Sequence, residues 1–87
     1  MLDPTEIGVP MARGSQYLLL RRPADALAAY EEGARQEPRP EIFLNIGRAA
    51  RMLGDTRRAR DAFARAIRLN PLLAAQVPPE EQPSSTP

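Results

Sequence analysis

The sequence contains no cysteine, no histidine and no tryptophan. Without cysteine the chain has neither a thiol nucleophile nor a disulfide framework, and without histidine as well it lacks the usual zinc ligands. Enzyme chemistry would depend on carboxylates, tyrosine, serine or arginine alone. The paired acids, Glu31 with Glu32 and Glu80 with Glu81, are sequence neighbours and do not form a catalytic carboxylate pair. The sequence therefore predicts a protein that is not an enzyme and that binds no cofactor or metal.

Long apolar runs and a strong charge of one sign are also lacking. The 87 residues carry a formal net charge of +1, from 12 basic residues, all of them arginine, and 11 acidic residues. This balance provides no overall field that would recruit nucleic acid or an anionic membrane. No apolar run approaches the roughly 20 residues that a membrane-spanning helix needs. We therefore expect neither a nucleic acid nor a membrane as partner.

The first ten residues, MLDPTEIGVP, contain an early acid and no apolar segment of the kind that a signal peptide requires. These features predict a cytoplasmic protein, although a piece cut from a longer exported protein would share them. A chain of this length forms one small domain, because it can bury only about 60% of its unfolded surface.

Proline and glycine divide the chain into helical segments. Pro23 and Pro40 stand at expected first helical positions, where the missing N–H is not needed. Gly54 can end a helix in the left-handed conformation, and Pro71 cannot continue one. We expect four helices, at about 10–20, 23–36, 40–53 and 56–69. Residues 1–9 form an N-terminal segment, and the tail from Pro78 should be disordered because it has no apolar residue to bury.

Each of the last three helices carries a stripe of apolar or small residues at spacings of three and four. These stripes predict the core, and they comprise Ala26, Ala29, Tyr30, Gly33 and Ala34; Phe43, Ile46, Gly47, Ala50 and Leu53; and Ala59, Ala62, Phe63, Ala66 and Ile67. Part of the pattern repeats, since Ala26, Tyr30, Gly33 and Pro38 precede Ala59, Phe63, Ala66 and Pro71 by one constant interval. A repeat of two helices with a period of roughly 33 residues is typical of a helical solenoid.

Residues 40–73 resemble the tetratricopeptide repeat family. The first helix of that family carries W-x2-L-G-x2-Y, and here these places hold Phe43, Ile46, Gly47 and Ala50. The second helix carries A-x3-F-x2-A before a proline, matched by Ala59, Phe63, Ala66 and Pro71. An upstream copy, about 7–39, matches at Gly14, Tyr17, Ala26, Tyr30 and Pro38, but departs from the motif at Pro10 and Arg13.

The resemblance implies an all-α fold, a right-handed solenoid of two helical hairpins within residues 10–73. Residues 74–87 would then form a short capping turn and the disordered tail. It also implies a non-catalytic adaptor or assembly subunit whose concave groove binds an extended or helical segment of another protein. The groove positions of the family fall on Met11, Ser15, Leu18, Leu19, Leu44, Asn45, Arg48, Arg51 and Met52.

Three of these groove residues suggest what the partner offers. In groove-binding members an asparagine at the place of Asn45 hydrogen-bonds the peptide backbone, and its amide can both donate and accept. Arg48 and Arg51 would suit an acidic and apolar segment, because arginine binds carboxylates in a bidentate manner. A solvated basic face remains the alternative. The clamp of chaperone-binding members is not expected, because Met11 and Ser15 replace its lysine and asparagine.

Solenoids generally need three or more repeats, and this sequence predicts two. The apolar surface at the open end of the second repeat therefore needs a cover. Either Leu72, Leu73 and Val77 fold back over Phe63 and Ile67, or another molecule covers this open end. Self-association, end to end or groove to groove, is therefore a second hypothesis. A third, an arginine-mediated nucleic-acid binder, rests on seven arginines against three acids in residues 40–73. It is disfavoured because aromatic residues are few, and Phe43 and Phe63 belong to the predicted core stripes rather than to a surface for base stacking.

Overall fold

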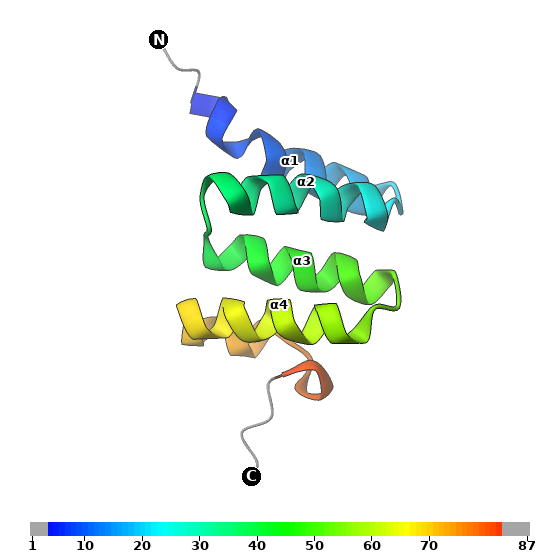
Figure 1. The fold of residues 1–87 in the computed structure, drawn as a ribbon, viewed down its shortest axis with the longest axis vertical. Coiled ribbons are helices and arrows are strands. Elements are labelled where there is room, and N and C mark those ends of the chain that lie inside the picture. Colours follow the sequence, from blue (N-terminus) through cyan, green and yellow to red (C-terminus); the bar gives the residue numbers. More distant parts are fainter. Residues whose placement is uncertain (1–3, 83–87) are drawn as a thin grey trace.

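The computed structural model describes residues 4–82, with side chains from residue 12 onward. Four α-helices follow one another, α1 (Pro4–Leu19), α2 (Pro23–Gln36), α3 (Pro40–Met52) and α4 (Thr56–Leu69). Two short 3-10 helices complete the chain, η1 (Pro71–Gln76) and η2 (Pro79–Glu81). The helices lie side by side across the long axis of the molecule (Figure 1). Residues 4–82 contain no strand, so the prediction of an all-α fold of helical hairpins is confirmed.

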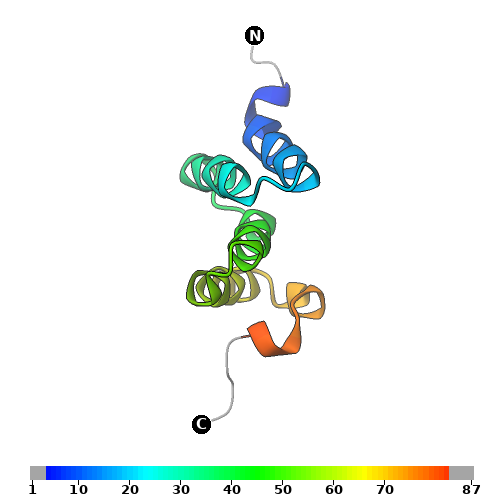
Figure 2. The same ribbon diagram turned by 90° about the vertical axis from the view of Figure 1, so that its right-hand side faces the viewer.

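The helices form two layers, as the view along their axes shows (Figure 2). One layer holds α1, α3 and η1, and its outer surface is called the A face below. The other layer holds α2 and α4, and its outer surface is called the B face. Each helix packs on the next one along the chain, and η1 and η2 both contact α4. Because η1 continues the layer of α1 and α3, it lies where the first helix of a third hairpin would be.

The same contact between a glycine and an aromatic ring is at the centre of both hairpins. Tyr30 and Phe63 are the largest fully buried side chains, and they lie against Gly14 and Gly47 respectively. A Cβ atom at either glycine would be less than 3.0 Å from three ring atoms. Both helix pairs can therefore approach closely only because these two positions carry no side chain.

The hydroxyl group of Tyr30 needs a partner because it is buried. Ser15 on α1 provides it, with 3.0 Å between the two hydroxyl oxygens. This hydrogen bond ties α1 to α2 at the centre of the first hairpin. Phe63 has no such group, so the second hairpin does without the bond.

The predicted core stripes are largely confirmed, with one error at the end of α3. Leu53 is exposed because it lies after the last helical residue, where Gly54 with φ 80° reverses the chain. Helix α3 also buries three side chains outside its predicted stripe, namely Ile42, Leu44 and Ala49. The reason is that α3 packs against both α2 and α4.

The two ends of the chain differ from the sequence-based expectation. The helix expected from residue 10 already includes residues 4–9, with Pro4 at its first position, where proline is tolerated. The tail is ordered as far as Gln82, whose side-chain amide donates to the carbonyl oxygens of Ala74 at 2.9 Å and Val77 at 3.0 Å. These two hydrogen bonds and the contact of η2 with α4 hold this segment against the fold. Residues 83–87 of the expected disordered tail lie outside the described part.

Each of the two hairpin turns contains one residue in the left-handed conformation. Arg21 has φ 58°, at the place where the second hairpin has Gly54. The left-handed conformation costs a non-glycine residue about 1–2 kcal/mol, and glycine would remove this cost. Glycine also has more conformational freedom in the unfolded chain, which lowers the free energy of unfolding by about 0.4–1 kcal/mol. We therefore expect Arg21→Gly to raise the free energy of unfolding by about 0.5–1 kcal/mol.

Urea unfolding followed by circular dichroism measures this change. The control is Arg21→Ala, because alanine keeps a Cβ atom and therefore keeps the cost of the left-handed conformation at φ 58°. Equal effects of the two substitutions would contradict the assignment of strain to Arg21.

Candidate functional site

The A face contains some of the residues predicted for the groove and excludes others. Leu44 is only 3% exposed, so it belongs to the core, and the prediction of a binding role for it is wrong. The hydroxyl group of Ser15 is engaged by Tyr30, and Leu18 packs against the core. The side chain of Met11 lies outside the described part of the chain.

The centre of the A face is a polar cluster that links α3 to η1. Arg48 is half-buried, and its guanidinium donates to the Oδ1 atom of Asn45 at 3.2 Å and to the Oε1 atom of Gln76 at 3.5 Å. Asn45 and Arg48 lie on the same helix, whereas Gln76 comes from the 3-10 segment. The cluster therefore brings two predicted groove residues together with one that sequence reasoning missed. The only polar side chain of the segment PLLAAQ, residues 71–76, is Gln76, and this was the signal in the sequence that could have revealed its role.

The open end of the solenoid is covered by the chain itself. Leu73 is 6% exposed and Val77 is 3% exposed, and both belong to the core cluster that contains Phe63. Pro71 begins η1, and the side chain of Asn70 accepts a hydrogen bond from the N–H of Leu72 at 3.1 Å. Of the two alternatives for this end, folding back is correct for Leu73 and Val77 but not for Leu72. Leu73 and Val77 are therefore not available as an interface, and only Leu72 remains exposed.

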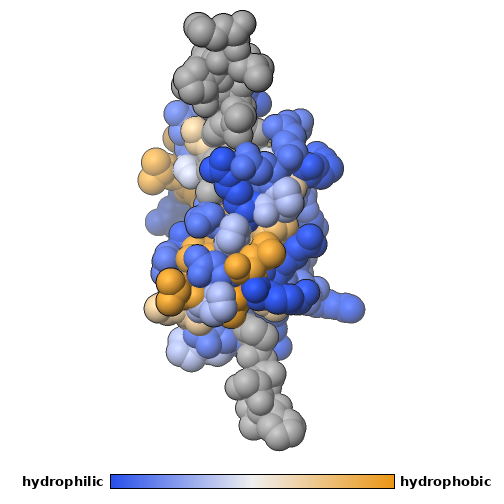
Figure 3. Space-filling model, turned by 90° about the vertical axis from the view of Figure 1, so that its left-hand side faces the viewer, coloured by the Kyte–Doolittle hydropathy of each residue, from blue (hydrophilic) through white to orange (hydrophobic). Residues whose placement is uncertain are grey.

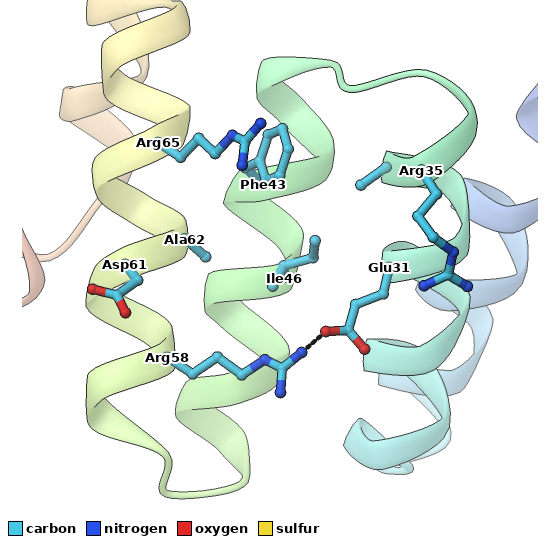
Figure 4. A pocket seen from close by; sticks show the side chains of 9 residues that line it. Glu31, Arg35, Phe43, Ile46, Arg58, Asp61, Ala62 and Arg65 are labelled. Atoms are coloured by element: carbon cyan, nitrogen blue, oxygen red, sulfur yellow. Dashed lines mark ion pairs between the residues drawn. The ribbon is translucent and has the colours of Figure 1, made fainter.

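A hollow that the sequence did not reveal lies on the B face. We call it the inter-repeat groove, since it separates α2 from α4 above a floor made by α3 (Figure 4). Its volume is about 390 Å³, and its lining comprises Glu31, Ala34, Arg35, Phe43, Ile46, Arg58, Asp61, Ala62 and Arg65. The signal that could have revealed it is the spacing of Arg58, Asp61, Ala62 and Arg65 along one side of α4.

Two arginines hold the sides of the inter-repeat groove in place. Arg58 on α4 forms an ion pair with Glu31 on α2, as the dashed line in Figure 4 marks. Both side chains are partly exposed to solvent, so the pair contributes at most about 1 kcal/mol to stability. Arg65 places its guanidinium 4.6 Å from the ring centre of Phe43. The groove is therefore lined by arginines that already have partners in the protein.

The comparisons with known proteins identify one of the two hairpins. Residues 40–73 match the family model of the tetratricopeptide repeat. This segment is a tetratricopeptide repeat. No curated protein and no solved structure gives a significant match to the chain. The matched repeat contains α3, α4 and the start of η1.

The tetratricopeptide repeat explains the geometry of the matched segment. Gly47 and Phe63 stand at the motif positions that let the two helices approach, and their contact is closer than any side chain at residue 47 would allow. Gly14 and Tyr30 form the same contact at the equivalent positions of the first hairpin. Tetratricopeptide repeats typically serve as protein-interaction modules without catalytic activity.

Within residues 4–82, no group of three or more acidic, histidine or cysteine residues is placed so that it could hold a metal ion. No helix in this part of the chain is both long and apolar enough to cross a lipid bilayer.

Proposed function

We propose that this protein is a cytoplasmic, non-catalytic adaptor or assembly subunit that binds a partner protein through its A face. The observation that carries the proposal is that Arg48 donates to Asn45 at 3.2 Å and reaches Gln76 of η1 at 3.5 Å, the upper limit of a hydrogen bond. A free arginine side chain loses conformational entropy when it binds, and an arginine that is already held loses less. Arg48 therefore forms a preorganised cationic site at the centre of the A face.

The chemistry of this site favours an acidic segment as the partner. A guanidinium can bind a carboxylate through two parallel hydrogen bonds. Arg51 lies one turn further along α3 and is exposed, so it can meet a second acid of the same segment. Asn45 would add a contact to the backbone of a bound peptide, as in the groove-binding members that the sequence resembles. We expect the partner to present alternating acidic and apolar residues.

Affinity capture with the full chain as bait tests the proposal. We expect Arg48→Ala to weaken the binding of the captured partner about tenfold or more, because a hydrogen bond to a charged group is worth about 1.5–3 kcal/mol. The matched control is Arg60→Ala, since Arg60 is exposed on α4 and lies outside both the A face and the inter-repeat groove. Equal retention of the partner by both variants would contradict binding at the A face. Circular dichroism spectra of the variants confirm that each is folded.

Self-association is disfavoured because η1 packs on α4. Leu73 of η1 and Val77 are buried in the core cluster, so the surface expected for end-to-end contacts is reduced to Leu72. We therefore expect a monomer at every concentration in size-exclusion chromatography coupled to light scattering. A mass that rises towards that of a dimer would contradict this expectation and would favour self-assembly over an adaptor role.

A further inference from the structure

The exposed apolar side chains of this protein are concentrated at its two hairpin turns. Of six large apolar residues that are exposed among the described side chains, four lie there: Leu19 at 84%, Leu20 at 65%, Met52 at 45% and Leu53 at 45%. The two pairs are separated by the same interval as the two buried aromatic residues, so they occupy equivalent places in the two hairpins. Both turns lie at the same side of the molecule, one above the other (Figure 1). We call these four residues the turn edge.

Positive charge surrounds the turn edge. The exposed residues next to it along the chain include Arg21, Arg22, Arg51 and Arg57. The two nearest acids are already engaged within the protein. Asp25 forms an ion pair with Arg22 at 2.7 Å, and Asp55 caps α4 by accepting from the backbone N–H of Arg58 at 3.1 Å. Arginine is therefore in excess at this edge, although the charge of the whole chain is close to balance.

The opposite end of the helices has a different surface. Figure 3 shows that hydrophilic residues cover most of that face and that apolar atoms appear only in small areas between them. Leu69 and Leu72 are also exposed, but they lie at the end of α4 and on η1, so among the described side chains the largest group of exposed apolar residues is the turn edge.

We infer that the turn edge docks on an anionic lipid surface. Leu19 and Leu20 project from the tip of a turn, and such side chains gain free energy when they enter the boundary between headgroups and acyl chains. Arginines beside them can keep their charged ends at the lipid phosphates while their aliphatic stems follow the leucines inward. The left-handed conformation of Arg21, where the other turn has glycine, keeps a cationic side chain at this tip despite its backbone cost.

Two other occupants fit the turn edge less well. A second copy of the chain would bring the arginines of both edges together, which is unfavourable because like charges repel. A protein partner would need two separate pockets to receive the two pairs of apolar side chains. A lipid interface is deformable and accepts both pairs without such pockets.

Co-sedimentation of the full chain with lipid vesicles tests the inference. We expect binding to vesicles of phosphatidylcholine mixed with phosphatidylglycerol, and at least about tenfold weaker binding to phosphatidylcholine alone, because the attraction to anionic lipid is lost. The variant L19S/L20S should bind the mixed vesicles at least about tenfold more weakly, since two apolar side chains are lost from the interface. The matched control is Leu72→Ser, because Leu72 is 83% exposed but lies on η1.

A second pair of variants tests the contribution of charge. Arg21→Gln should weaken binding to the mixed vesicles, whereas Arg60→Gln, on the outer side of α4, should not. Raising the salt concentration should weaken binding of the unchanged protein as well. If the unchanged protein stays in the supernatant with anionic vesicles, or if Leu72→Ser weakens binding as much as L19S/L20S, the inference is wrong. Vesicle binding does not involve Arg48, so this experiment and the capture experiment at the A face can fail independently.

Discussion

Replacing Phe63 with alanine lowers the free energy of unfolding by about 3–5 kcal/mol, the range for large-to-small changes of aromatic residues in a core. Phe63 is 0% exposed and lies against Gly47, at the centre of the hairpin formed by α3 and α4. Loss of its ring leaves a cavity that the surrounding helices can close only in part. A protein of this size has a total stability of about 4–13 kcal/mol. Phe63→Ala therefore removes a large part of this stability and can unfold the protein.

Urea or thermal unfolding followed by far-ultraviolet circular dichroism measures the loss. The matched control is Leu72→Ala, which removes a large apolar side chain that is 83% exposed. A surface change of this kind should alter stability by no more than about 0.5 kcal/mol. If Phe63→Ala left the unfolding midpoint unchanged, the packing of α3 on α4 around this ring would be wrong.

Replacing Gly47 with alanine destabilises the protein by about 1–3 kcal/mol, the usual cost of overpacking a core. The sign is informative, because glycine to alanine in a helix normally stabilises by about 1 kcal/mol. At Gly47 the added Cβ atom would be less than 3.0 Å from three atoms of the Phe63 ring. The ring is fully buried, so it cannot move aside without displacing its neighbours. Steric overlap therefore outweighs the gain in helix propensity.

A double-mutant cycle separates this overlap from other effects of the substitution. In the background of Phe63→Leu, the smaller side chain leaves room for the methyl group, so Gly47→Ala should cost less there. We expect a coupling free energy of at least about 1 kcal/mol between the two positions, within the range for residues in contact. Additive effects, or a raised melting temperature for Gly47→Ala alone, would contradict the close contact of Gly47 with Phe63.

The proposed A face and the turn edge are centred on different parts of the same two hairpins, although Arg51 lies beside both. Arg48 lies on the side of α3 that faces η1, whereas Leu19 and Leu20 lie at the tip of the α1–α2 turn. A partner segment on the A face and a lipid surface at the turn edge could therefore be engaged together. The inter-repeat groove on the B face lies apart from both, and its arginines are engaged within the protein.

Local signals in the sequence were sufficient for much of the fold. Pro23, Pro40 and Gly54 act on the backbone of their own residues, so the bounds of α2 and α3 could be predicted to within one residue. The internal repeat placed Tyr30 and Phe63 at equivalent buried positions, because the same helix contact requires the same residue types. The family of residues 40–73 also followed from this pattern.

The sequence was less informative wherever a third element decides which side chains are covered. Leu44 was expected on the surface, but it is buried because α3 packs against elements on more than one side. Leu73 and Val77 were candidates for an interface until η1 folded back onto α4. The inter-repeat groove was missed for the same reason, since its residues come from three different helices.

The sequence by itself determined the helices, their pairing into hairpins and the equivalent places of Tyr30 and Phe63 in the core stripes. These features depend on backbone conformation and on spacing within a single hairpin, which residue types encode directly. Only the tertiary structure decided that Arg48 meets Gln76 of η1 and that the exposed leucines of one turn share an edge with Met52 and Leu53 of the other. The physical reason is that a surface is composed of neighbours in space, and stacking of the two hairpins brings together residues that no local pattern connects.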